Sequence, residues 1–253
     1  MHTTTLPSMP ALEVTHLAIA PVKGLRLTAA DELEIGPSGP VGDRAFLVVD
    51  ADNSLLLTTR TPALLQVAAR WDGEALALTF PDGAEVAAVP EPGEPATTAN
   101  YEGRPIPGRL VEGELAVALS EHLGQPVRLL ARDPSARGAD DAAVTLMSQA
   151  SLDALGVPDA RRFRMTITID GVDAWEEHGW RGRELAVGEA VLRVTEPVPR
   201  CVVTTRDPDS GRRDAPTLKA IAQLRGKDDV TFGVWCEVVV PGRVRVGDAV
   251  ASA

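Results

Sequence analysis

Turn-forming residues divide this chain into short segments along its whole length. The 253 residues include 22 glycines and 20 prolines, with Asp-Gly pairs at 72–73 and 82–83. Between such turns lie short runs rich in Val, Leu and Ile, among them residues 13–19, 44–50 and 75–80. Turns repeated about every ten residues are typical of all-β barrels and sandwiches and leave little room for long helices. The spacing therefore predicts a mainly β protein with a few helices.

The middle of the chain predicts a division into two domains. Residues 91–98 are rich in Pro, Gly and Thr and show no periodicity, which is typical of a linker or long surface loop. We therefore expect one domain over residues 11–100 and a second over residues 101–253. Apolar spacing, cap residues and terminal glycines predict helices at 113–123, 148–156 and 216–224. Further strands are expected at 55–58, 64–71, 127–130 and 164–169, with a closing hairpin at 234–246.

The charge balance argues against two classes of partner. Lys and Arg number 25 and Asp and Glu number 36, giving a net charge of −11. An acidic surface repels phosphate backbones and anionic lipid headgroups, so we expect neither a nucleic-acid nor a membrane partner. No apolar run reaches the roughly 18 residues of a membrane span, and the first residues lack the features of a secretion signal. We therefore expect a cytoplasmic protein.

The two cysteines of the chain differ in their surroundings. Cys201 follows Arg200 directly, and a neighbouring cation lowers a thiol pKa, so a thiolate acting as nucleophile or soft metal ligand is one interpretation. The other is a small buried residue at the start of a strand. Cys236 lies inside a strand pattern and is expected in the core. A Cys-His hydrolase would need His178 as its base, but the acidic and glycine neighbours of that histidine favour a surface turn.

Several cations fall at strand ends or loops of both expected domains. Lys23, Arg44 and Arg60 belong to the first domain, and Arg164 and Arg200 belong to the second. The start of the helix at Ser148 adds backbone N–H donors. If the domains bring these groups together, they form an anion site between the two, beside the Cys201 thiol.

Motifs along nearly the whole chain resemble the molybdenum cofactor sulfurase C-terminal (MOSC) family. In the second half, RCVVTTRDPDSG at 200–211 is followed by PTL, FGV and VGD. In the first half, PVKG at 21–24, GDRAF at 42–46 and TTR at 58–60 are similar to the β-barrel domain that precedes it in the family, and RFR at 162–164 with EEHGW is similar to two further family segments. The motifs occur in the family's order, which makes the resemblance specific.

The resemblance implies a fold, a cofactor and roles for particular residues. The fold would be a MOSC N-terminal β-barrel domain followed by a MOSC β-barrel domain, and the cofactor would be molybdenum bound to molybdopterin. Cys201 would ligate the metal, and a pterin dithiolene would supply further sulfur ligands. Asp140 would lie close to the metal and serve as a proton donor, although the neighbouring Asp141 makes this match ambiguous. The cofactor-binding residues would be Lys23, Arg44, Arg60, Thr145, Ser148, Arg164 and Arg200.

The resemblance also implies an activity and its alternatives. Characterised relatives reduce N-hydroxylated small molecules, with S-oxygenated compounds as neighbouring substrates, and pyridoxal phosphate binding is also ascribed to the family. Electrons would come from a separate ferredoxin, flavoprotein or cytochrome. The alternatives are a molybdenum cofactor or sulfur carrier without turnover, and an interaction module with an inert core thiol. Met165-Thr166 stands where the family has Pro-Asn, and Gly24 follows Lys23 where the family has Ser, so the shape of the pterin pocket departs from the family pattern.

Overall fold

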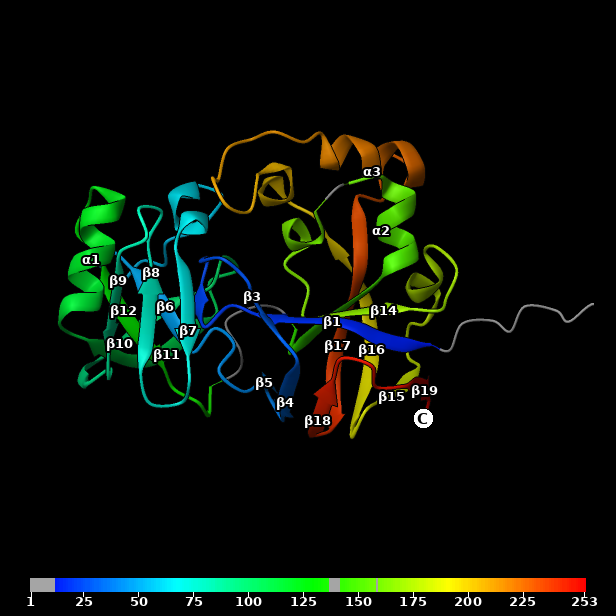
Figure 1. Cartoon of the computed structure of the whole chain (residues 1–253), viewed down its shortest axis with the longest axis horizontal. Helices are drawn as coiled ribbons and strands as arrows, with labels where there is room; N and C mark the ends of the chain where they lie inside the picture. Colours follow the sequence, from blue (N-terminus) through cyan, green and yellow to red (C-terminus); the bar gives the residue numbers. More distant parts are fainter. Residues whose placement is uncertain (1–11, 137–141, 158) are drawn as a thin grey trace, which may run out of the picture.

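The computed structural model describes residues 12–136, 142–157 and 159–253, and this part of the chain is mostly β, as predicted. Figure 1 shows two lobes side by side: α1 (Glu114–Leu123) lies at the outer edge of the first, and the second carries α2 (Gln149–Leu155) and α3 (Thr217–Arg225). Within the described residues, no helix is both long and apolar enough to cross a membrane.

The second lobe is built on an eight-stranded sheet that includes the start of the chain. Its order is β19-β15-β16-β17-β13-β14-β1-β3, in which β13 and β14 are parallel and the other neighbours are antiparallel. Val14 and Leu17 of β1, which lie on either side of a register shift, form the main core of this lobe together with apolar residues of the neighbouring strands. The strands span Glu13–Ile19 (β1), Thr28–Ala30 (β3), Val144–Ser148 (β13), Ile167–Asp170 (β14), Glu184–Val187 (β15), Ala190–Pro199 (β16), Thr231–Val240 (β17) and Val250–Ser252 (β19).

The first lobe packs two small sheets and α1 around a second core. One sheet has the order β10-β11-β12-β6-β2, and the other has the order β7-β8-β9. Buried Leu and Val side chains from both sheets and from α1 meet in this core. The strands span Val22–Lys23 (β2), Phe46–Val49 (β6), Ala68–Trp71 (β7), Leu76–Thr79 (β8), Glu85–Ala88 (β9), Pro92–Ala99 (β10), Pro105–Val111 (β11) and Arg128–Arg132 (β12).

The strand pairing favours a later domain division than residue 100. Strands β11 and β12 lie beyond that residue, yet β11 pairs with β10 and β12 pairs with β6 of the first lobe. The strands β1 and β3 are at the start of the chain, yet both lie in the sheet of the second lobe. We therefore propose that the chain divides after β12, and that its first strand belongs to the second lobe.

The sequence predictions for residues 91–98 and for the closing hairpin are wrong. The segment 91–98, expected as a linker, is largely β10, an edge strand whose register shifts between Pro92 and Pro95. Proline lacks a backbone N–H, and an edge strand tolerates this because one side of it needs no partner. The expected hairpin at 234–246 does not form either. After β17, strand β18 (Gly242–Arg245) pairs with β4 (Glu32–Gly36), which in turn pairs with β5 (Gly39–Pro40).

The helix predictions are confirmed, with small shifts at the ends. Both α1 and α2 end at a glycine in the left-handed conformation, Gly124 and Gly156, and the Ser148 hydroxyl caps α2 by accepting from the Ser151 N–H.

The expected strand at 64–71 begins instead as a 3-10 helix, η1, because Pro62 favours a helical start, and becomes β7 only at residue 68. Of the strand expected at 55–58, only a bridge between Leu55 and Val49 forms. The 3-10 helices are η1 (Pro62–Gln66), η2 (Ala160–Phe163), η3 (Glu176–Gly179) and η4 (Val202–Thr205).

Candidate functional site

Cys201 lies on the surface, at the point where β16 has ended and η4 begins. Cys201 is exposed to solvent, whereas Cys236 is buried in the second lobe. The chain behind Cys201 is fixed, because the Thr204 N–H and the Thr204 hydroxyl both donate to the Cys201 carbonyl, at 3.2 and 3.0 Å. An inert core thiol at position 201 is therefore contradicted. A thiol on a fixed backbone and open to solvent can act as a ligand or a nucleophile.

Arg200 points the opposite way, into the protein. Its guanidinium donates to the Phe232 carbonyl from Nε at 2.9 Å and to the Phe163 carbonyl from Nη1 at 2.9 Å. It also lies over the Phe163 ring, 5.4 Å from the centroid. Burial lowers the pKa of Arg200, and the neighbouring Cys201 acts in the opposite direction. These contacts fix Arg200, and with it the backbone that leads into Cys201. The expected contact of Arg200 with a cofactor stays a prediction.

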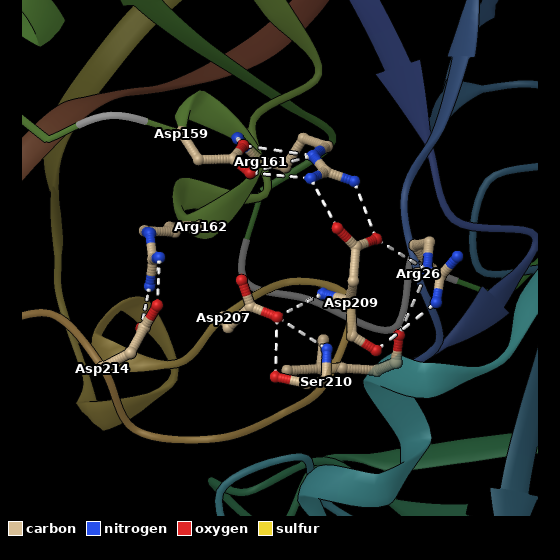
Figure 2. A network of polar contacts seen from close by, with 9 residues as sticks. Arg26, Asp159, Arg161, Arg162, Asp207, Asp209, Ser210 and Asp214 are labelled. Carbon is tan, nitrogen blue, oxygen red and sulfur yellow. Dashed lines mark hydrogen bonds and ion pairs between the residues drawn. The ribbon is translucent and has the colours of Figure 1, made fainter. Parts of the chain in front are cut away.

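The loop after η4 ties the Cys201 segment to the first lobe (Figure 2). Asp207 shapes this loop by accepting from both the N–H and the hydroxyl of Ser210, each at 2.7 Å. Asp209 then receives a bidentate pair from Arg161 of η2, at 2.9 and 2.8 Å, and an ion pair from Arg26 of the first lobe at 3.3 Å. We call the residues Asp207, Asp209, Arg161 and Arg26 the lobe clamp.

Two backbone contacts complete the attachment of this loop. The Gln66 side chain donates to the Ser210 carbonyl at 2.9 Å. Gly211 adopts a φ of +70°, and a Cβ built at Gly211 would lie only 2.5 Å from the Pro62 carbonyl oxygen. A nearby pair of the second lobe, Arg162 with Asp214, holds the pKa of Asp214 below its usual value through hydrogen bonding.

We expect Gly211→Ala to loosen this attachment. Gly156 provides a matched control, because its φ is +67° and a Cβ there would meet no atom within 4 Å. Gly156→Ala should cost about 1 kcal/mol of unfolding free energy through backbone strain alone. Gly211→Ala adds the clash with the Pro62 carbonyl and should cost about 2 to 3 kcal/mol. Urea unfolding of both variants measures the difference, and equal losses would show that the contact across the lobes contributes nothing.

A small cavity, which we call the Arg44 cavity, lies between residues of the first lobe and strand β13 of the second. It holds about 40 Å³, and its walls include Arg44, Arg132, Thr145 and Thr166. Arg44 adopts a left-handed φ of 46° and pairs with Asp43, whose other carboxylate oxygen accepts from the Ala20 N–H at 2.8 Å. The Asp43 carboxylate also lines the cavity and offsets one of its two arginines, so its described charged walls keep a net positive charge, which suits an anion.

The remaining predicted cations are distributed around the same junction. Lys23 lies in β2, beside Leu47 of β6. Arg164, with a φ of 54°, crosses to the first lobe and donates to the Leu25 carbonyl at 2.7 Å. Arg60 is exposed in a turn before η1. The structure thus brings Arg164 against the segment that carries Lys23. For Arg60, its expected role in binding the cofactor stays a prediction.

Ser148 lies away from any open surface. Its hydroxyl donates to the buried carboxylate of Glu177 at 3.0 Å, and Ser151 donates to the same carboxylate at 2.9 Å. Sequence reasoning missed Glu177, because an acidic residue in a Glu-Glu-His-Gly stretch indicates a surface turn. Asp140, the expected proton donor, and Asp141 lie outside the described residues.

His178 does not form a dyad with Cys201. Neither of its ring nitrogens has a hydrogen-bond partner in the part of the chain that the structure describes, and both nitrogens are buried. Burial lowers the pKa of His178 to about 4, with a smaller contribution from Arg225. The imidazole is therefore neutral at physiological pH and has no contact through which it could activate a thiol.

Comparison with known proteins identifies the two halves of the chain. A family model of the MOSC domain matches residues 133–251, and a model of the MOSC N-terminal beta barrel domain matches residues 11–126. The chain is a MOSC domain protein. The two matches meet between β11 and β13, which agrees with the later domain division proposed from the strand pairing.

Curated relatives of this MOSC domain protein match most of its length at low identity. Mitochondrial amidoxime-reducing component 1 of Homo sapiens is 28% identical over 94% of this chain and 82% of its own, and that of Xenopus laevis is 27% identical over 94% and 81%. Molybdenum cofactor sulfurase of Drosophila pseudoobscura pseudoobscura is 27% identical over 76% of this chain and 27% of its own.

The donor atoms at the junction fit a molybdenum-pterin cofactor, whereas the Arg44 cavity is too small to enclose one. Among the described residues, no three His, Cys, Asp or Glu side chains gather to hold a metal ion. A pterin dithiolene supplies sulfur ligands of its own. A space of about 40 Å³ has room for a few water molecules and not for a pterin. The Arg44 cavity can therefore take at most an anionic end of the cofactor.

Proposed function

We propose that this chain is a molybdenum-cofactor-dependent oxidoreductase that reduces N-hydroxylated small molecules or related S-oxygenated compounds. The observation that carries the proposal is the exposed residue Cys201, whose backbone is fixed and whose segment is held to the first lobe by the lobe clamp. The relatives named amidoxime-reducing components support the substrate class. Reduction of an N–OH group to N–H takes up two electrons and two protons and releases water.

In this proposal the residues divide the work of holding the cofactor. Cys201 supplies one soft sulfur ligand, and Arg200 keeps its backbone in place from inside the protein. Arg44, Arg132 and Thr145 line a cavity that suits an anionic group, and Lys23 and Arg164 add positive charge at the junction. When bound, the cofactor supplies a metal that changes its oxidation state during the reaction.

The electron donor is proposed to be a separate protein, either a ferredoxin, a flavoprotein or a cytochrome. Cytoplasmic location and pyridoxal phosphate binding stay predictions.

A second candidate function is that of a carrier, which holds the cofactor or its sulfur without turnover. The relative named molybdenum cofactor sulfurase favours it. Both candidates place the cofactor at Cys201, so molybdenum content alone does not separate them.

Counting turnovers separates an enzyme from a carrier. Protein produced with molybdate is mixed with benzamidoxime and reduced methyl viologen as an artificial electron donor. An enzyme should form many equivalents of benzamidine for each molybdenum atom, because the donor restores the reduced state after each reaction. A carrier gives at most one equivalent. Protein from a host that lacks the cofactor is the control, and product formed equally by that protein would contradict both candidates.

A further inference from the structure

Exposed cations gather on the chain segment that follows Cys201. Residues 206–219 contain four Lys and Arg against three Asp, whereas the whole chain has 25 Lys and Arg against 36 Asp and Glu. Three of the four cations, Arg212, Arg213 and Lys219, are exposed. The first two lie between η4 and α3, and the third lies in the first turn of α3. We call these three residues the cationic face.

Hydrogen bonds hold this segment against the element that begins at Cys201. The Thr205 carbonyl accepts from the Asp214 backbone N–H at 3.1 Å, and the Thr217 hydroxyl donates to the Thr204 carbonyl at 2.8 Å. Thr204 and Thr205 belong to η4, which starts directly after Cys201. In Figure 1 the segment arches along the top of the molecule toward α3. The cationic face therefore lies on the same structural unit as the exposed thiol.

The acidic residues of the segment do not neutralise the cationic face. Asp209 belongs to the lobe clamp and pairs with two arginines outside the segment, and Asp214 pairs with Arg162. Asp207 keeps its negative charge, because hydrogen bonds lower its pKa, but Arg206 next to it in the sequence is one cation against it. Within the described residues, no cation of the cationic face has a carboxylate at ion-pair distance. The face therefore keeps a net positive charge.

The charge of the rest of the chain makes this face selective for an acidic partner. The chain carries a net charge of −11, and exposed arginines elsewhere, such as Arg70 and Arg193, pair with acidic neighbours. Most of the surface therefore repels an acidic protein, while the cationic face attracts it. Complementary charge of this kind steers the encounter and fixes the orientation of the partner.

We propose that the cationic face is the docking surface for an acidic electron-transfer protein. The inference rests on the proposed function, which requires a separate electron donor. Electron transfer between proteins slows steeply with distance, and docking at this face brings the donor to the side of the molecule that carries Cys201. Carboxylates of the donor pair with Arg212, Arg213 and Lys219. The interface should be small and short-lived, as is typical of electron-transfer complexes.

The electron count fits such a transient partner. Reduction of one N–OH group takes up two electrons and two protons and releases water. A one-electron donor therefore docks twice in each turnover, and each docked molecule leaves oxidised by one electron. Because the donor must be replaced, attraction by exposed charges suits the task better than a large apolar interface.

Binding tests the docking surface without turnover. A plant-type ferredoxin, which is a small acidic iron-sulfur protein, is titrated calorimetrically into the full chain at about 20 mM NaCl. We expect a dissociation constant in the micromolar range. Binding should weaken at least about tenfold at about 200 mM NaCl, because salt screens exposed charges. Absence of binding at low salt, or binding of phosphatidylserine vesicles in place of ferredoxin, would overturn the proposal.

Two double variants with the same change of net charge assign the binding to the face. The first combines Arg212→Glu with Arg213→Glu. The control combines Arg109→Glu with Arg183→Glu, which are exposed arginines of β11 and of the position before β15. The first should bind ferredoxin at least about tenfold more weakly than the wild type, and the control should change binding less than about threefold. Equal losses in both would show that net charge alone matters and would contradict a docking surface.

Turnover separates this inference from the proposed function. With benzamidoxime as substrate, the Arg212→Glu, Arg213→Glu variant should raise the KM for reduced ferredoxin at least about tenfold. Its turnover with reduced methyl viologen should not fall, because a small donor needs no docking surface. No turnover of the wild type with methyl viologen would contradict the proposed function. Normal turnover with methyl viologen and an unchanged KM for ferredoxin in the variant would instead contradict the docking surface.

Discussion

Replacement of Cys201 by serine should remove molybdenum from the protein and abolish the proposed reductase activity. Serine has nearly the same size, but its hydroxyl is a hard and poorly ionised ligand, whereas the proposed ligand is a soft thiolate. Because Cys201 is exposed and its side chain does not cap η4, the variant should melt as the wild type does. We expect at least about a 100-fold fall in activity, since even outer-shell changes at metal sites cost 10-fold to 100-fold. Elemental analysis of purified protein measures the metal directly.

The second cysteine supplies the matched control. Cys236 is fully buried, and burial raises its thiol pKa to about 12, so it stays protonated and is not a ligand. Cys236→Ala should lower stability by about 1 to 2 kcal/mol through the space it leaves, yet retain the molybdenum content of the wild type. Equal molybdenum in wild type and Cys201→Ser would remove Cys201 from the site.

Replacement of Arg200 by methionine should have the largest effect on stability. Methionine can still pack on Phe163 and Phe232, but it leaves both of their carbonyls without the guanidinium donor. A buried acceptor that loses its donor costs about 1 to 3 kcal/mol, so two of them give a loss of about 3 kcal/mol. For a chain of this size the melting temperature should fall by about 10 °C.

Arg212→Met provides the control, because Arg212 is an exposed residue of the neighbouring loop. It should melt within about 1 °C of the wild type, since surface substitutions cost little. Thermal unfolding of both variants without cofactor checks the prediction. A normal melting temperature for Arg200→Met, together with loss of molybdenum, would show that Arg200 serves the cofactor and not the fold.

The sequence predicted what depends on local chemistry. The strand at 13–19, the cap at Ser148 and the glycine that ends α2 each follow from residues within one turn or strand, and all three are confirmed. The burial of Cys236 followed from its strand pattern in the same way. The family and its two domains were also predicted, because several motifs in a fixed order carry more information than any one of them.

What depends on distant parts of the chain was not predicted. Pro92 and Pro95 lie in a strand at the edge of its sheet, where a missing N–H needs no partner on one side. The pairing of β18 with β4 joins opposite ends of the sequence, and no local pattern indicates it. The inward direction of Arg200 and the burial of Glu177 depend on partners elsewhere, namely the Phe163 and Phe232 carbonyls for the first and Ser148 and Ser151 for the second.

The position of β1 in the sheet of the second lobe has a consequence for biosynthesis. Strand β1 leaves the ribosome first, but its partner β14 is made only after the whole first lobe. The first lobe can therefore collapse on the ribosome while β1, which already has β3 beside it in the sequence, still lacks β14. The apolar residues Val14 and Leu17 stay accessible during that interval, which makes this segment a natural target for chaperones during translation.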